Sequence, residues 1–163
     1  MGHHFDDQGS KYDADGNLKN WWTPEDRKKF EERVACVVDQ FDKLEVGEGL
    51  HHNGKLVVGE AMGDRSGITL SYRAYKRSLR GKPEPPLIEG FTADQRFFLG
   101  FARVWADQSR PEETRRRLNT DPHPLPRFRV IGTLQNMPEF HQAFQCKPGD
   151  PMVRPTATQC RLW

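Results

Sequence analysis

The sequence predicts a mainly α fold with little or no sheet. Apolar residues recur three or four positions apart along several stretches of the 163-residue chain, which is the spacing of a helix that buries one face. Capping residues stand at the beginnings of these stretches, prolines and glycines separate them, and strand signal is weak throughout. We expect helices in five ranges: 24–43, 57–79, 92–108, 111–118 and 138–144.

The first expected helix begins after Thr23, whose hydroxyl can cap it. Pro24 stands in the first turn, and two acids follow near the positive end of the helix dipole. Apolar side chains then recur at helical spacing as far as Phe41. We interpret this stripe as core, on a helix that also carries Cys36.

The second expected helix, 57–79, follows a loop at 47–54. Glu60 and Asp64 lie four residues apart near its beginning and therefore share a face. Judged on their own, such acids are more often solvated residues that favour the helix dipole than a functional pair.

The remaining elements follow a proline-rich connection at 82–90. Thr92 and Gln95 form a capping box before a strongly apolar helix, which we expect to be central. A short basic helix begins at Pro111, and three prolines make 120–126 irregular. A last short helix precedes a tail without regular structure.

Composition indicates one domain and names no partner. The chain is 35% hydrophobic and 29% charged, its mean hydropathy of -0.85 is low for a self-contained core, and its net charge is only +2. No apolar stretch of the sequence approaches the ~20 residues that a membrane-spanning helix needs, and no signal peptide is recognisable at the beginning of the chain. The basic run 115–117 lacks the interleaved aromatic residues of a nucleic-acid site, so we expect no nucleic-acid partner.

Two further features stay open when judged from the residues alone. The three cysteines, Cys36, Cys146 and Cys160, fit one disulfide plus a free thiol as well as three reduced thiols. The stretch 13–17, DADGN, has its glycine at the fourth place of a calcium loop instead of the sixth. Pro24 occupies the position of the bidentate glutamate, so we interpret this stretch as a plain turn.

Several segments in order carry a resemblance to a known family. They are HHFDDQG near the beginning, GEAMGD at 59–64, YRAYKR at 72–77, FFLGFARVWA at 97–106, DPHP at 121–124, FRVIGTLQNMPEF at 128–140, and the terminal CRLW. Together they resemble the C-terminal part of neprilysin-family zinc metallopeptidases, which include endothelin-converting enzyme. The resemblance implies that residues 1–163 are the C-terminal helical part of a thermolysin-like (gluzincin) catalytic domain. The upstream half of that domain and the family's N-terminal helical domain would be absent.

The resemblance also implies a zinc site. The family has His-Glu-x-x-His followed by x-Phe-Asp-Asp, and matching Phe5 onwards places the second histidine at His3. The first histidine and the catalytic glutamate would precede Met1, and His4 would be a bystander. Glu60 would be the third ligand, and Asp64 would orient a ligating histidine through its other ring nitrogen.

Further roles follow from the same match. His123 and Arg129 correspond to family residues that stabilise the oxyanion of the transition state and contact the substrate backbone. Val104 and Trp105 would line the pocket for the apolar side chain after the scissile bond, although they fit the core of the third helix equally well. Cys36 and Cys160 would form a disulfide, and Cys146 would pair with an upstream cysteine.

The implied activity is zinc-dependent hydrolysis of peptide bonds in oligopeptides, with peptides as the substrate. We expect the chain alone to be inactive and to bind its one zinc ion weakly or not at all. His3 and Glu60 are only two ligands, and His3 lies at a frayed end with no preceding helical turn to hold it. Exposed apolar faces predict self-association or contact with the upstream part of the polypeptide.

The cysteine pair favours an extracytoplasmic location. The alternative is a short protein that kept the fold without catalysis and serves as a binding or assembly module.

Overall fold

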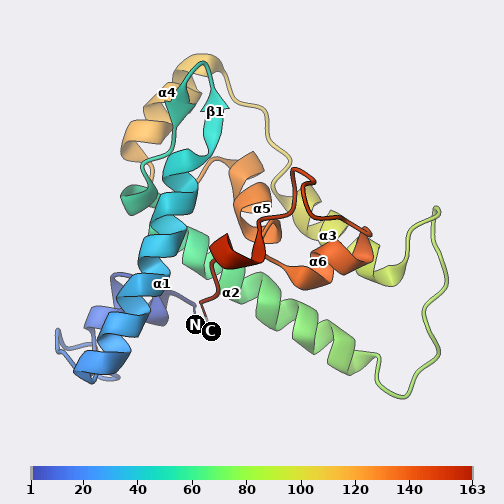
Figure 1. Cartoon of the computed structure of the whole chain (residues 1–163), viewed down its shortest axis with the longest axis horizontal. Coiled ribbons are helices and arrows are strands. Elements are labelled where there is room, and N and C mark those ends of the chain that lie inside the picture. The colour runs from blue at the N-terminus through green and yellow to red at the C-terminus, as the bar shows by residue number, and fades with distance from the viewer. Residues whose placement is uncertain (1, 163) are drawn as a thin grey trace.

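A computed structural model describes residues 2–162, so Met1 and Trp163, the last residue of the terminal Cys-x-x-Trp motif, lie outside the described residues. The mainly α fold is confirmed, and one two-stranded antiparallel hairpin is the sheet found in this part of the chain (Figure 1). None of the described helices is both long and apolar enough to cross a membrane. The helices are α1 (Pro24–Lys43), α2 (Gly54–Ser78), α3 (Ala93–Val104), α4 (Pro111–Thr120), α5 (Pro126–Leu134) and α6 (Pro138–Ala143); the strands are β1 (Glu45–Gly47) and β2 (Leu50–His51); the 3-10 turns are η1 (Gly2–Phe5), η2 (Gly9–Lys11) and η3 (Thr156–Thr158).

The pair α1 and α2 forms the base on which the other elements pack. The hydroxyl of Thr23 caps α1 by accepting from the amide of Asp26, as predicted. Helix α2 begins three residues earlier than predicted because the side chain of Asn53 caps it. A Cβ on Gly54 would lie 2.2 Å from the carbonyl oxygen of Val38, so the beginning of α2 approaches α1 more closely than any other residue type allows.

Three sequence predictions were wrong in detail. Helix α3 ends at Val104, four residues early. Helix α5 was missed, because Pro126 was read as part of an irregular stretch although it stands in the first turn of a helix, where its missing N–H costs nothing. The expected loop at 47–54 contains strand β2, which pairs with β1 around a turn in which Glu48 and Gly49 have positive φ.

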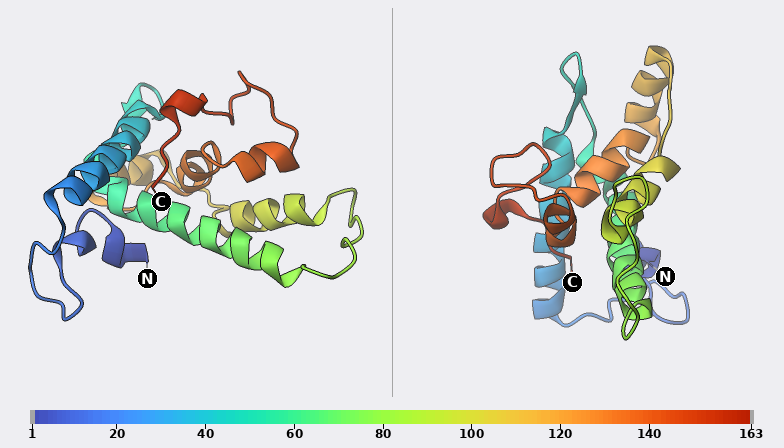
Figure 2. Two further views of the ribbon diagram at one scale, coloured as in Figure 1. Left: turned by 60° about the horizontal axis from the view of Figure 1, so that its bottom comes forward. Right: turned by 90° about the vertical axis from the view of Figure 1, so that its right-hand side faces the viewer.

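The core has two parts, one at each end of α2. The first lies between α1 and the N-terminal half of α2 and includes Leu162 of the C-terminal tail. The second joins the C-terminal half of α2 to α3 and to the end of α5, and Figure 2 shows α2 and α3 running side by side. Phe98 of α3 is buried there, whereas Leu99 is exposed, so α3 is buried on one face only and is less central than expected.

A disulfide joins Cys36 of α1 to Cys160 across 124 positions, with 5.5 Å between the two Cα atoms. The amide of Cys160 also donates to the side chain of Asn136, at the end of α5. These contacts hold the C-terminal tail against the body of the molecule. Cys146 is a free thiol.

Candidate active site

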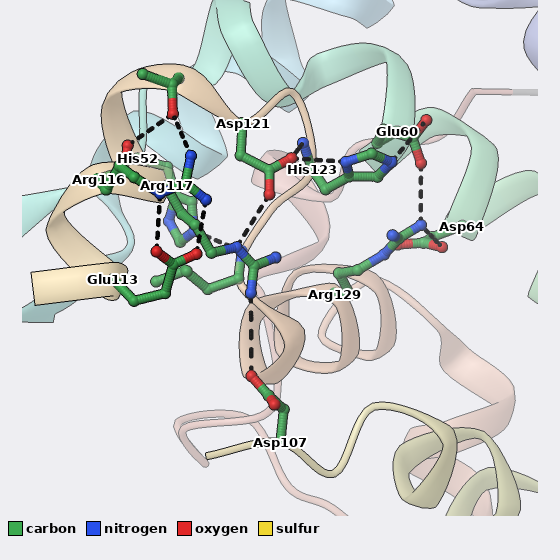
Figure 3. Close-up of polar contacts among 12 residues, drawn as sticks. His52, Glu60, Asp64, Asp107, Glu113, Arg116, Arg117, Asp121, His123 and Arg129 are labelled. Atoms are coloured by element: carbon green, nitrogen blue, oxygen red, sulfur yellow. Dashed lines mark hydrogen bonds and ion pairs between the residues drawn. The ribbon is translucent and has the colours of Figure 1, made fainter. Parts of the chain in front are cut away.

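Four of the predicted site residues come together around the carboxylate of Glu60 on α2. Its Oε1 lies 3.4 Å from Nε2 of His3 and 3.5 Å from Nε2 of His123. Its Oε2 accepts a hydrogen bond of 3.1 Å from Nη2 of Arg129 (Figure 3). These residues belong to η1, α2, the segment that joins α4 to α5, and α5, so the fold assembles the cluster from segments far apart in sequence.

His3 is held in place by Asp6, three residues further along the chain. Nδ1 of His3 lies 2.7 Å from Oδ2 of Asp6, while Oδ1 of Asp6 accepts from the amides of Gln8 and Gly9. Asp6 is buried, and a Cβ on Gly9 would lie 1.8 Å from the carbonyl oxygen of His3. His3 is therefore anchored, contrary to the expectation of a loose chain end, and Nε2 faces Glu60. Sequence analysis used Asp6 only to align the motif; the His-x-x-Asp spacing was the available signal.

Asp64 and Arg129 form a bidentate ion pair on one side of the cluster. Nε and Nη2 of Arg129 donate to the two carboxylate oxygens of Asp64 over 2.6 and 2.7 Å. Burial raises the pKa of Asp64, although the hydrogen bonds and charge of Arg129 oppose that rise. Burial also disfavours the charge on Arg129, but its bonds to Asp64 and Glu60 outweigh this and raise its pKa. No histidine of residues 2–162 bonds to Asp64, so its predicted part in orienting a ligand stays a prediction.

The ring of Trp105 covers the outer face of that guanidinium, whose central carbon lies 4.0 Å from the ring centroid. A guanidinium stacked on an indole gains a cation–π attraction and keeps its orientation. Trp105 therefore contacts the site directly. Val104 is 72% exposed, which excludes a core role for it, and its place in a substrate pocket stays a prediction.

A chain of charged groups fixes His123. Nδ1 of His123 and its backbone amide both lie within hydrogen-bonding distance of Oδ1 of Asp121, at 2.6 and 3.0 Å. Oδ2 of Asp121 accepts from Nε of Arg117 over 3.0 Å (Figure 3). Burial would raise the pKa of Asp121, but the bonds from His123 and Arg117 outweigh it and lower the pKa to about 2. Asp121 is thus ionised at neutral pH and keeps Nε2 of His123 turned toward Glu60.

The contact of Arg117 with Asp121 was not predicted, because the three arginines of α4 were considered together as a solvated face. Each of them pairs with a carboxylate of the chain: Arg115 with Glu48, Arg116 with Glu113, and Arg117 with Asp121. This pairing leaves little free positive charge on α4 for a nucleic acid.

The stretch 13–17 is a turn, as predicted, because the side chain of Asp13 accepts hydrogen bonds from the backbone amides two and four residues further on.

A buried histidine supports the segment between His123 and α5. Nε2 of His52 accepts from the amide of Leu125 over 3.1 Å, and its ring packs edge-on against Phe41 and Phe128. Burial lowers the pKa of His52 to about 4, so the ring is neutral at physiological pH and can accept that hydrogen bond. Sequence analysis gave no role to His52.

The side chains of this cluster include donor types that bind zinc, but fewer of them are expected ligands than a catalytic zinc site requires. Imidazole nitrogen and carboxylate oxygen are zinc ligands, and a catalytic zinc site has three protein ligands and one open position. His3 and Glu60 are two of the expected ligands, and residues 2–162 contain no group of three or more histidine, cysteine, aspartate or glutamate side chains placed to hold a metal ion.

Comparison with known proteins gives consistent matches over the whole chain. The family model described as peptidase family M13 matches residues 1–161. Endothelin-converting enzyme 1 of Cavia porcellus is 42% identical over 163 residues, covering 99% of this chain and 21% of that protein. Neprilysin-21 of Caenorhabditis elegans is 39% identical and covers 100% of this chain and 22% of its own length. The chain therefore spans about a fifth of these curated relatives.

Solved structures give the same result. The Mycobacterium tuberculosis zinc metalloprotease Zmp1, in complex with an inhibitor, matches with a TM-score of 0.93 and 39% identity over 99% of this chain and 25% of its own. PepO from Lactobacillus rhamnosis HN001 matches with a TM-score of 0.84 and 36% identity over 99% of this chain and 24% of its own.

Proposed function

The chain belongs to peptidase family M13, and on that premise we propose that it is the C-terminal part of the catalytic domain of a neprilysin-like zinc metalloendopeptidase that hydrolyses peptide bonds in oligopeptides. The observation that carries the proposal is the convergence of His3, His123 and Arg129 on Glu60. No local rule of secondary structure brings two histidines and an arginine from three other segments onto one carboxylate.

The residues divide the work of the reaction between them. His3 and Glu60 would hold zinc, and the chemistry that zinc would supply there is activation of a water molecule for attack on a peptide carbonyl. Nδ1 of His123 lies 2.6 Å from Oδ1 of Asp121, which leaves Nε2 facing the cluster, where an N–H on this nitrogen would stabilise the developing oxyanion. Nη1 of Arg129 makes no hydrogen bond to the described residues and is free to donate to a carbonyl of the substrate backbone.

We further propose that the 163-residue chain is inactive by itself. Two zinc ligands bind the ion weakly, and none of the carboxylates that contact the cluster is free to act as a base, since Asp6, Asp64 and Asp121 are each held by hydrogen bonds. We expect a weak zinc affinity that falls when His3 is replaced by Ala. The adjacent substitution His4→Ala should leave it unchanged. Chelator-sensitive peptide hydrolysis by the isolated chain would contradict this proposal.

A chimera tests the peptidase function directly. This chain would replace the quarter of the Mycobacterium tuberculosis Zmp1 chain that it matches. We expect the chimera to hydrolyse a fluorogenic peptide and to lose that activity on Glu60→Ala, with His4→Ala as the control. A folded chimera without activity would overturn the proposal.

The alternative, a binding or assembly module without catalysis, is supported by exposed apolar side chains. Leu18, Leu87 and Val104 are each at least 65% exposed. Such side chains favour association with another chain. Size-exclusion chromatography coupled to light scattering distinguishes a monomer from a self-associated form, and the chimera decides between catalysis and its absence.

We propose an extracytoplasmic location, because the disulfide between Cys36 and Cys160 needs an oxidising compartment to form and persist. Mass spectrometry of the chain isolated from its native cells under alkylating conditions tests this. Two alkylated thiols at these positions would contradict it.

A further inference from the structure

A cavity of about 530 Å³ lies apart from the cluster around Glu60. Its walls come from the middle of α2 and from the turn that joins α5 to α6, and residues of η1 and of the C-terminal tail complete it. None of Glu60, Asp64, His123 and Arg129 lines it. Its volume is within the range of small-molecule sites, about 300–1,000 Å³.

One wall of this cavity carries a buried guanidinium that has no counter-ion among the described residues. Arg65 on α2 is only 9% exposed, and no side chain of residues 2–162 forms a hydrogen bond or an ion pair with it. Its charged neighbours, Arg154 and Arg161, have the same sign. Burial and these neighbours lower its pKa to about 10, so Arg65 stays positively charged at neutral pH. A buried charge without a partner is costly, which is why such groups usually face an anion.

The other lining residues define what kind of anion the cavity suits. Arg73 and Arg161 add positive charge, Glu139 is the one carboxylate among the described lining residues, and Leu70 and Met137 supply apolar surface. An apolar wall beside a guanidinium suits a ligand that has both an apolar group and an anionic head. Glu139 repels a second negative charge, which favours a monoanion over a phosphate or a dicarboxylate.

We propose that this cavity binds an organic monocarboxylate that bears an apolar group. The carboxylate pairs with Arg65 through two parallel hydrogen bonds, the arrangement that a planar guanidinium favours, and the apolar group lies against Leu70 and Met137. The site is independent of the proposed peptidase activity, since it shares no side chain with the Glu60 cluster.

The test is calorimetric titration of the whole chain with 3-phenylpropionate, and with 3-phenylpropanamide as a neutral ligand of the same shape. We expect saturable binding of the acid and about tenfold or more weaker binding of the amide. Arg65→Met should weaken binding of the acid by a similar factor. Arg80→Met, which removes an exposed arginine outside the cavity, should leave it unchanged.

The proposal would be overturned by the absence of saturable binding of the acid, by equal affinity for acid and amide, or by unchanged affinity in Arg65→Met. Equal competition by sulfate would also overturn it, because it would mean that any anion suffices. Arg65→Lys covers the case in which the Met variant does not fold. Lysine keeps the charge but cannot form the two parallel hydrogen bonds, so affinity should fall several-fold, and an unchanged affinity counts against the proposed pairing.

Discussion

Replacing Arg129 by Met removes the cation that lies between two carboxylates of α2. The guanidinium is 12% exposed and the carboxylate of Asp64 is 8% exposed, so water compensates little for the loss. Breaking a buried ion pair by removing one partner costs about 3–5 kcal/mol. We expect the free energy of unfolding, measured by urea denaturation at pH 7, to fall by about that amount. Arg127→Met, an exposed arginine of the same helix, should change it by less than about 0.5 kcal/mol.

A double-mutant cycle separates the ion pair from other effects of the substitution. Asp64→Asn removes the charge of Asp64 but keeps the shape of its side chain, and Arg129 retains Glu60 and Trp105. That substitution should cost about 1.5–3 kcal/mol. The double variant should lose less than the sum of the single losses, by about 1.5 kcal/mol or more. Additive losses would refute the pairing of Asp64 with Arg129 as the source of this stability.

The pH dependence gives an independent check on the same pair. Burial already raises the folded pKa of Asp64 above 3.8, and loss of Arg129 removes its hydrogen bonds and its charge, which are the two largest effects that lower this pKa. A carboxyl group with a raised pKa stabilises the fold while it is protonated, and this stability is lost as the pH rises through the folded pKa. The loss caused by Arg129→Met should therefore be greatest near neutral pH and diminish on acidification. A loss that stays constant from pH 7 to pH 4 would contradict this reasoning.

Three further predictions concern the parts that support the site. Reduction of the disulfide, which spans 124 positions, should lower the free energy of unfolding by up to about 5 kcal/mol in the chain-entropy model, measured by urea denaturation with and without reductant. Because the pKa of His52 falls from 6.5 to about 4 on folding, the stability that depends on its neutral form is present above pH 6.5. As the pH falls toward 4, up to about 3 kcal/mol is lost, and His52→Gln should flatten this part of the pH–stability curve. Gly9→Ala should displace the turn that holds His3 and lower the thermal midpoint, whereas Gly67→Ala, where a Cβ meets nothing within 4 Å, should not.

The helices were predictable wherever a local signal marked their ends. Thr23 before α1 and the Thr92–Gln95 capping box before α3 are readable in the sequence. Helix α1 begins at Pro24, as predicted, and α3 begins at Ala93, one residue after the predicted start. Helix α5 was not predicted, because Pro126 can begin a helix as well as interrupt one, and the choice depends on buried contacts of Phe128 and Leu134 that are distant in sequence. Local physics thus predicted the scaffold better than the segment that carries Arg129.

For the candidate site, the sequence indicated the central residues but not the residues that support them. Glu60, His123 and Arg129 were found through a family resemblance, and no spacing rule in the chain relates residues that far apart. Their supporting partners were missed although they are near in sequence: Asp6 lies three residues after His3, and Arg117 lies four residues before Asp121, at the end of the same helix. A known motif can propose the groups that do the chemistry, but local spacings such as these are common in any helix or turn, and only the placement of His3 and His123 around Glu60 shows which of them support the cluster.

The two carboxylates of α2 connect these observations. Acids four residues apart on a helix repel each other unless a cation lies between them, and Arg129 is that cation, because it bonds to both oxygens of Asp64 and to Oε2 of Glu60. Oε1 of Glu60 is left facing the ring nitrogens of His3 and His123. The two oxygens of Glu60 therefore have different tasks: Arg129 fixes one in position, and the other is turned toward the histidines, where we propose that it meets the metal.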